Sequence, residues 1–223
     1  MNKKLFFDAI FKYLLGFIVI GLLIFLPAGT LDWTNGWIFM LVLFIPMFIA
    51  GVIMMIKDPN LLRSRLNIKE KQNEQKEVVL LGGLMFLVGF IIAGLNYRFN
   101  FIELPNIVTI ISSIVFILSY ILYGEVLREN AYLSRTIEVQ KGQKVVDTGL
   151  YGIVRHPMYF STLFMFLSIP LILGSIISFI IFLVYPVLII KRIKNEEKVL
   201  EKELKGYKEY KKKIKYRLIP FIW

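Results

Sequence analysis

Long apolar blocks dominate this sequence and restrict what it can fold into. Four of them, residues 11–26, 37–56, 78–95 and 107–127, approach the length of a membrane-spanning helix, which needs about 20 mainly apolar residues. Of the 223 residues, 57% are hydrophobic and only 19% are charged, which is more apolar and less charged than a typical soluble domain. We therefore expect an all-α integral membrane protein and exclude an ordinary soluble globule.

A fifth apolar block, residues 158–190, is too long for one span and short for two. Pro170 and the Gly174-Ser175 pair lie near its middle, where they favour a turn. The block predicts a helix-turn-helix hairpin that enters and leaves on the same side, so we expect about six membrane helices. The chain then divides into an N-terminal four-span membrane region, residues 1–127, and a C-terminal region, residues 128–223.

Lys and Arg residues collect on one side of this topology. Of the 27, 26 lie in the N-terminal segment, in the loops at 57–77 and 128–156, or in the tail from Lys191, whereas the alternate loops carry only Arg98. Because basic loops stay in the cytoplasm, we expect both termini and both long loops there. The net charge of +11 then reflects topology and attraction to anionic lipid, and is poor evidence for nucleic acid.

The composition also limits the chemistry. The chain has no cysteine and one histidine, His156, which excludes thiolate metal sites, cysteine nucleophiles and multi-histidine metal sites. The outer loops are short and carry few reactive side chains. We expect an active site to be assembled at the inner membrane surface from the loop at 128–156, the hairpin and the tail.

The loop before the hairpin contains turn signals at Gly142 and Gly149. Apolar residues alternate between positions 137 and 146, which predicts short extended pieces rather than a helix. Pro157 suits the first position of a helix, so the hairpin is expected to begin there.

Arg155 and His156 stand immediately before that helix. A guanidinium, an imidazole and free backbone N–H groups at one helix N-terminus attract a carboxylate or a phosphate. The alternative is that Arg155 is a membrane anchor and His156 a helix cap.

The tail reads as an amphipathic helix over residues 191–213. On a helical wheel Glu196 falls in the centre of the apolar stripe, with Arg192 one turn before it and Glu197 nearer the edge. A charged pair on the packed side suggests function, because an unpaired buried charge is expensive. The alternative is a weak ion pair along a helix that lies in the headgroup layer.

Several motifs resemble one family. Residues 149–159, Gly-Leu-Tyr-Gly-Ile-Val-Arg-His-Pro-Met-Tyr, are similar to the cofactor motif of the isoprenylcysteine carboxyl methyltransferase family and its phospholipid methyltransferase-like relatives. The pattern Arg192-x3-Glu196-Glu197-x2-Leu200 and the later Tyr207-x2-Tyr210 are also similar, over roughly 100 residues in all. The ending at 215–223 resembles a bacterial branch, which implies a bacterial-type cell membrane.

The resemblance implies a methyltransferase that uses S-adenosyl-L-methionine as its methyl donor. A sulfonium donor is already activated, so the reaction needs alignment and exclusion of water rather than a metal. The residues expected to contact the cofactor are Gln140, Gln143, Lys144, Val145, Val146, Tyr151, Arg155, His156, Pro157, Tyr159, Glu196 and Glu197. Arg192 is expected to be catalytic and to hold an acceptor carboxylate by paired hydrogen bonds.

Three alternatives concern what the protein does. The acceptor is expected to be lipophilic, for example the carboxylate of a prenylcysteine-like molecule, but a thiol or a phospholipid amine is also consistent with the motifs. Membrane sterol reductases share the C-terminal architecture and use NADPH, which makes a reductase the second hypothesis. The third is a non-catalytic membrane protein whose motifs serve only as anchors.

Overall fold

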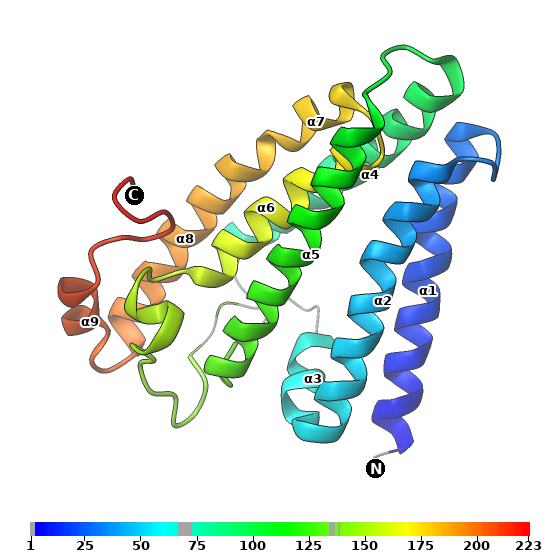
Figure 1. The fold of residues 1–223 in the computed structure, drawn as a ribbon. Coiled ribbons are helices and arrows are strands. Elements are labelled where there is room, and N and C mark those ends of the chain that lie inside the picture. Colours follow the sequence, from blue (N-terminus) through cyan, green and yellow to red (C-terminus); the bar gives the residue numbers. More distant parts are fainter. Residues whose placement is uncertain (1–2, 67–72, 134–136, 138) are drawn as a thin grey trace.

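The computed structural model describes residues 3–66, 73–133, 137 and 139–223, and every regular element in those ranges is helical (Figure 1). The basic residues Lys69, Lys71 and Arg135 of the predicted cytoplasmic loops lie outside the described residues. The helices are α1 Lys3–Ala28, α2 Thr34–Lys57, α3 Pro59–Leu66, α4 Asn73–Phe99, α5 Asn106–Glu129, the 3-10 turn η1 Gly149–Gly152, α6 Pro157–Ile172, α7 Ile176–Phe182, α8 Val184–Glu203 and α9 Tyr207–Lys213.

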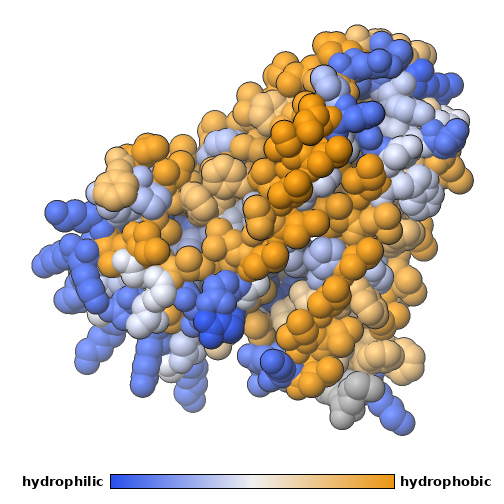
Figure 2. All heavy atoms as spheres, in the orientation of Figure 1, coloured by the Kyte–Doolittle hydropathy of each residue, from blue (hydrophilic) through white to orange (hydrophobic). Residues whose placement is uncertain are grey.

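Five helical segments are long and apolar enough to cross a membrane: α1, α2, residues 75–99 of α4, α5, and α7 joined to α8. Large apolar side chains cover their outer faces, and Ile18, Ile49 and Leu118 are each more than half exposed. Figure 2 shows these side chains as a broad apolar band between two hydrophilic ends. The protein is therefore an integral membrane protein, as the hydropathy predicted.

The predicted hairpin forms, but its two arms differ in length. Its turn lies at Gly174, where the backbone φ is 74°, whereas Pro170 lies inside α6. α6 has only 16 residues. The described residues therefore contain five helices of spanning length and this one shorter apolar helix, and the predicted total of about six membrane helices is not confirmed. The second arm is interrupted only at Leu183, because Pro186 has no N–H to donate to the Phe182 carbonyl.

The predicted tail helix over residues 191–213 is wrong in both of its bounds. α8 begins at Val184, within the last candidate span, and runs without a break to Glu203. The chain then turns at Gly206, whose φ of 88° favours glycine, and α9 begins at Tyr207. The turn brings α9 back against α8, which one continuous helix would not do.

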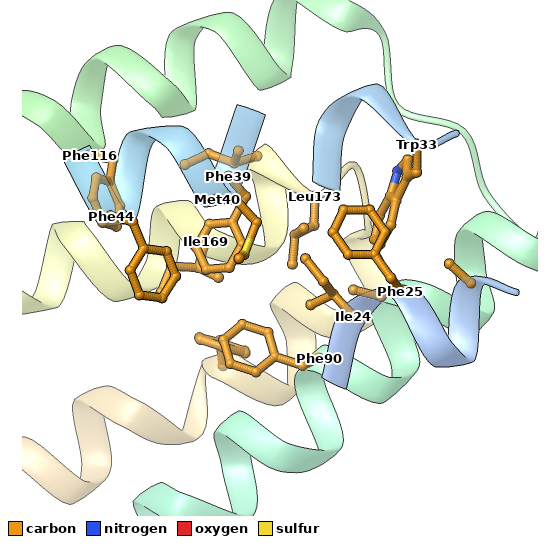
Figure 3. Packing of buried hydrophobic residues seen from close by; sticks show 14 of the residues in the cluster. Ile24, Phe25, Trp33, Phe39, Met40, Phe44, Phe90, Phe116, Ile169 and Leu173 are labelled. Carbon is orange, nitrogen blue, oxygen red and sulfur yellow. The ribbon is translucent and has the colours of Figure 1, made fainter. Parts of the chain in front are cut away.

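Aromatic and aliphatic side chains from six helices form the main core (Figure 3). α1 and α4 approach closely because Gly94 has no side chain, and a Cβ there would lie 2.6 Å from the Ile24 carbonyl oxygen. The Ser178 hydroxyl of α7 donates to the Gly89 carbonyl of α4 at 2.8 Å. These contacts fix the helices whose polar ends carry the site.

The basic segments gather toward one end of the bundle. The N-terminus, α3, the start of α6 and the end of α8 lie toward that end, and the short connections between spans lie at the other (Figure 1). This is the segregation that the Lys and Arg distribution predicted. That the basic end faces the cytoplasm stays a prediction.

Candidate functional site

Backbone hydrogen bonds join the start of α6 to the end of the chain. The Arg155 N–H donates to the Tyr216 carbonyl at 3.0 Å, and the His156 N–H donates to the Arg217 carbonyl at 2.9 Å. α6 begins at Pro157 with His156 as its N-cap residue, as the sequence predicted. The motif residues are therefore held on two sides, by the helix that they start and by the C-terminal segment.

The turn η1 depends on a glycine. Gly149 has a φ of 52°, and the next N–H, of Leu150, donates to both oxygens of the Glu129 carboxylate at 3.0 and 3.2 Å. A Cβ on Gly149 would overlap that carboxylate. The turn buries the ring of Tyr151, whose hydroxyl accepts from the Asn130 amide at 3.0 Å.

A cavity of about 100 Å³ lies between this loop, the start of α6, α8 and α9. Its walls combine carboxylate, guanidinium, imidazole and phenol groups with aliphatic side chains, a composition typical of small-molecule sites. The predicted site residues that line it are Gln143, Lys144, Val145, Val146, Tyr151, Arg155, His156, Tyr159, Arg192 and Glu196. The structure therefore brings together ten of the side chains that the sequence singled out.

Tyr159 links the two charged groups of α8 at this cavity. Its hydroxyl donates to Glu196 Oε2 at 2.5 Å and accepts from Arg192 Nε at 2.9 Å. The tyrosine is buried, so the hydrogen-bonded array is held in place by its ring. The array presents a carboxylate and a guanidinium side by side in one pocket wall.

Glu197 lies outside the lining of the cavity and forms an ion cluster with Arg155, His156 and Arg217, while Lys211 Nζ lies 3.8 Å from its Oε2. Arg155 Nε donates to Glu197 Oε1 at 2.7 Å, and Arg217 Nε donates to Oε2 at 2.9 Å. The imidazole of His156 lies 3.4 Å from Oε1. We call Glu197, Arg155, His156 and Arg217 the Glu197 cluster.

The helical wheel misjudged the two glutamates. It placed Glu196 at the centre of the packed face and Glu197 near the edge, but Glu197 is only 3% exposed and Glu196 is half-buried. The reason is that Arg217 and the start of α6 pack against the Glu197 side of α8 and supply its partners. Long-range partners of this kind are invisible to helix periodicity.

Gln140 and Pro157 also lie outside the lining of the cavity, among the residues that the structure describes. Gln140 folds the loop: its N–H donates to Gln143 Oε1 at 2.8 Å, and its side-chain amide donates to the Tyr132 carbonyl at 2.8 Å. The loop between residues 137 and 146 forms no helix where the chain is described, as predicted, and its non-helical pieces pair into no strand.

The prediction of site residues missed part of the lining. Asn130, Tyr132, Leu133, Ile137, Met158, Leu200, Leu204, Tyr207 and Tyr210 also face the cavity. Tyr207 and Tyr210 were visible in the sequence, because they lie on the apolar face of the tail and in the family-like pattern. Asn130 and Tyr132 carry no sequence signal of this kind.

Burial raises the pKa of three tyrosines at the site, Tyr151, Tyr207 and Tyr210. The carboxylates of Glu196 and Glu197 raise the pKa of Tyr207 further, so these phenols are protonated at neutral pH. At the rim, a hydrogen bond from the Lys213 ammonium at 2.8 Å lowers the pKa of Asp147. That pair ties the loop to the end of α9.

Fold and site together define the class of protein. It is an all-helical integral membrane protein with a polar and aromatic pocket built at the basic end of its last helices. The sequence profile of the phospholipid methyltransferase family matches residues 106–206, from the first residue of α5 to the glycine before α9. This region therefore matches that family, which confirms the resemblance that the motifs indicated.

Two curated relatives match part of this chain. It is 32% identical over 91 residues to the Delta(14)-sterol reductase TM7SF2 of Mus musculus, and 29% identical over 93 residues to the Delta(14)-sterol reductase of Methylotuvimicrobium alcaliphilum. Each match covers 40% of this chain but only 22% of the relative. The chain therefore shares less than a quarter of the length of these relatives.

Proposed function

We propose that the protein is an S-adenosyl-L-methionine-dependent membrane methyltransferase with a lipophilic acceptor, such as the carboxylate of a prenylcysteine-like molecule. One observation carries the proposal: His156, Tyr159, Arg192 and Glu196 line one pocket within the region that matches a methyltransferase family. The division at residue 128 stays part of this proposal, although the family region already begins at residue 106.

The pocket has groups that suit the parts of this cofactor. Glu196 can accept hydrogen bonds from ribose hydroxyls or from an ammonium group. The His156 imidazole, at the N-terminus of α6, can hold a carboxylate, and the rings of Tyr151 and Tyr207 supply apolar surface. When bound, the cofactor supplies a methyl group already activated by its sulfonium charge.

The remaining catalytic work falls to residues of this chain. Tyr159 orients the Arg192 guanidinium through its 2.9 Å hydrogen bond, and we assign Arg192 to the acceptor carboxylate. The aliphatic side chains of Val145, Val146 and Leu200 line the same cavity and exclude water from it. A carboxylate acceptor is ionised at neutral pH, so it needs alignment more than a general base.

The second candidate is an NADPH-dependent membrane reductase, which the names of both relatives favour. A 2′-phosphate would require cations in the pocket. In the described lining these are Lys144, Arg155 and Arg192, and Arg155 is already bonded to Glu197. Only two of the three, Lys144 and Arg192, lie outside that buried ion pair. Because a 2′-phosphate calls for several cations, this lining favours the methyltransferase.

Ligand-induced stabilisation of the purified protein in detergent separates the two functions. We expect S-adenosylhomocysteine to raise the unfolding midpoint and NADPH to leave it unchanged. Transfer of a labelled methyl group from S-adenosylmethionine into a lipid extract then identifies the acceptor. Stabilisation by NADPH alone would replace the methyltransferase with the reductase, and stabilisation by neither would favour a non-catalytic protein.

The cytoplasmic location of the basic end is the last part of the proposal. The chain has no cysteine, so single cysteines can be introduced without a background. A cysteine at exposed Lys205 should react with a membrane-impermeant thiol reagent only after the cells are opened, and one at Leu31 in intact cells. The reverse labelling pattern would mean that the basic end faces the outside of the cell.

A further inference from the structure

We propose that Tyr207 is a direct ligand-binding residue of the pocket and that its hydroxyl donates a hydrogen bond to an acceptor oxygen or nitrogen of the nucleoside cofactor. The proposal rests on the proposed function for the identity of that cofactor. Tyr207 lines the cavity and is 4% exposed. Its hydroxyl oxygen is buried and has no hydrogen-bond partner in the described part of the chain.

Three other tyrosines that line the cavity have hydroxyls that are hydrogen-bonded to protein groups. Tyr210 donates to the Tyr151 carbonyl at 2.8 Å, and the hydroxyl of Tyr151 accepts from Asn130 at 3.0 Å. Tyr159 bonds to Glu196 and Arg192. Since buried hydroxyls in proteins nearly always have a partner, the unpartnered Oη of Tyr207 stands out within the same cavity.

The position of Tyr207 is fixed by the fold. Gly206 turns the chain back from α8 with a φ of 88°, and the Tyr207 N–H donates to the Leu204 carbonyl at 3.2 Å. Its ring packs in a cluster with Leu204, Tyr210 and Ile214. A ring held in this way cannot swing to reach another protein acceptor, so the hydroxyl is preorganised for a group that enters the cavity.

Its protonation state defines the chemistry that it recognises. Burial and the nearby carboxylates raise the pKa of Tyr207, so the hydroxyl carries its proton at neutral pH. Glu196 in the same lining accepts hydrogen bonds, and Tyr207 adds a neutral donor. A sugar or amino-acid group of a nucleoside cofactor presents donors and acceptors that match this combination.

The test compares Tyr207→Phe with Tyr185→Phe as the matched control. The Tyr185 hydroxyl donates to the Thr162 hydroxyl at 2.9 Å, and Tyr185 lies outside the cavity lining. We expect Tyr207→Phe to bind S-adenosylhomocysteine about 3- to 10-fold more weakly while its ligand-free unfolding midpoint is unchanged or higher. Tyr185→Phe should show the opposite: a lower midpoint and an unchanged affinity.

Each outcome bears on a different claim. Equal affinity of Tyr207→Phe and wild type, or a drop in its ligand-free midpoint as large as that of Tyr185→Phe, would overturn the role of Tyr207. If the wild type binds NADPH and not S-adenosylhomocysteine, the methyltransferase proposal fails, and the same Kd comparison is made with NADPH. Binding of neither nucleotide by the wild type would overturn both.

Discussion

Glu196 and Glu197 are adjacent in sequence, yet the structure gives their carboxylates opposite environments. Glu197 is 3% exposed and accepts from two guanidinium groups at 2.7 and 2.9 Å. Glu196 lines the cavity and accepts from Tyr159. We therefore expect Glu197→Gln to reduce stability and Glu196→Gln to reduce ligand binding, although both changes remove one negative charge from the same turn of α8.

The expected magnitudes follow from the partners left behind. Removing one member of a buried ion pair costs about 3–5 kcal/mol. Arg155 keeps hydrogen bonds from Nη1 to the Ile214 and Lys215 carbonyls at 2.7 and 2.8 Å, so we place Glu197→Gln near the lower end, about 3 kcal/mol. For a chain of this size that lowers the unfolding midpoint by roughly 6–12 °C.

Glu196→Gln should change stability by less than about 1 kcal/mol, because the amide oxygen still accepts from Tyr159. Its affinity for S-adenosylhomocysteine should fall about 10- to 100-fold if the carboxylate binds the cofactor. Both variants are compared by thermal unfolding with and without ligand. Adding Arg217→Gln to Glu197→Gln should cost less than the sum of the two single changes, since they share one interaction.

Two results would contradict these expectations. A Glu197→Gln protein as stable as the wild type would mean that the Glu197 cluster contributes nothing to stability. A Glu196→Gln protein that is the less stable of the two would mean that the environments of the two carboxylates are reversed.

Three further changes test separate parts of the site. Arg192→Ala should reduce methyl transfer about 10- to 100-fold with little effect on cofactor binding, and equal losses in the two assays would contradict its assignment to the acceptor. Gly149→Ala should lower the free energy of unfolding by about 2–4 kcal/mol, from left-handed strain and overlap with Glu129, whereas Gly142→Ala at open space should cost only about 1–2 kcal/mol. Because Lys213 holds the pKa of Asp147 below its ordinary 3.8, the pair stabilises the fold above that pH. The midpoint difference between wild type and Asp147→Asn should be present at pH 7 and vanish as the pH falls through the lowered pKa, and a difference that grows in acid would refute it.

Local sequence signals predicted the features that depend on residues close together in the chain, namely the apolar spans and the start of α6. Hydropathy located the five candidate spans of the described residues because a helix in lipid needs an unbroken apolar stretch, and Pro157 marked the start of α6 because proline suits that position. The helical wheel extended the predicted tail helix past residue 203 because it considers only periodicity, although Gly206 is itself a turn signal.

The environment of Glu197 could not be predicted in the same way. Its partners Arg155 and Arg217 are 42 and 20 residues away in the sequence, and only tertiary contact brings them to α8. The same holds for Asn130, which reaches Tyr151 from the end of α5. The pocket was predictable as a meeting of three segments, but which side chain faces the cavity and which faces the protein depends on how the segments pack.

The unequal arms of the hairpin set the depth of the pocket. α6 has 16 residues and is about 24 Å long at 1.5 Å per residue, less than the roughly 30 Å of a bilayer core. The other arm, Ile176–Glu203, has 28 residues and is about 42 Å long.

Counted from the shared turn at Gly174, Tyr159 lies about 20 Å along one arm and Glu196 about 30 Å along the other. Since their side chains meet at 2.5 Å, the longer arm must be inclined to the shorter one. We infer that the pocket lies closer to the turn than the full thickness of a bilayer core, at a depth that a lipid-anchored acceptor can reach.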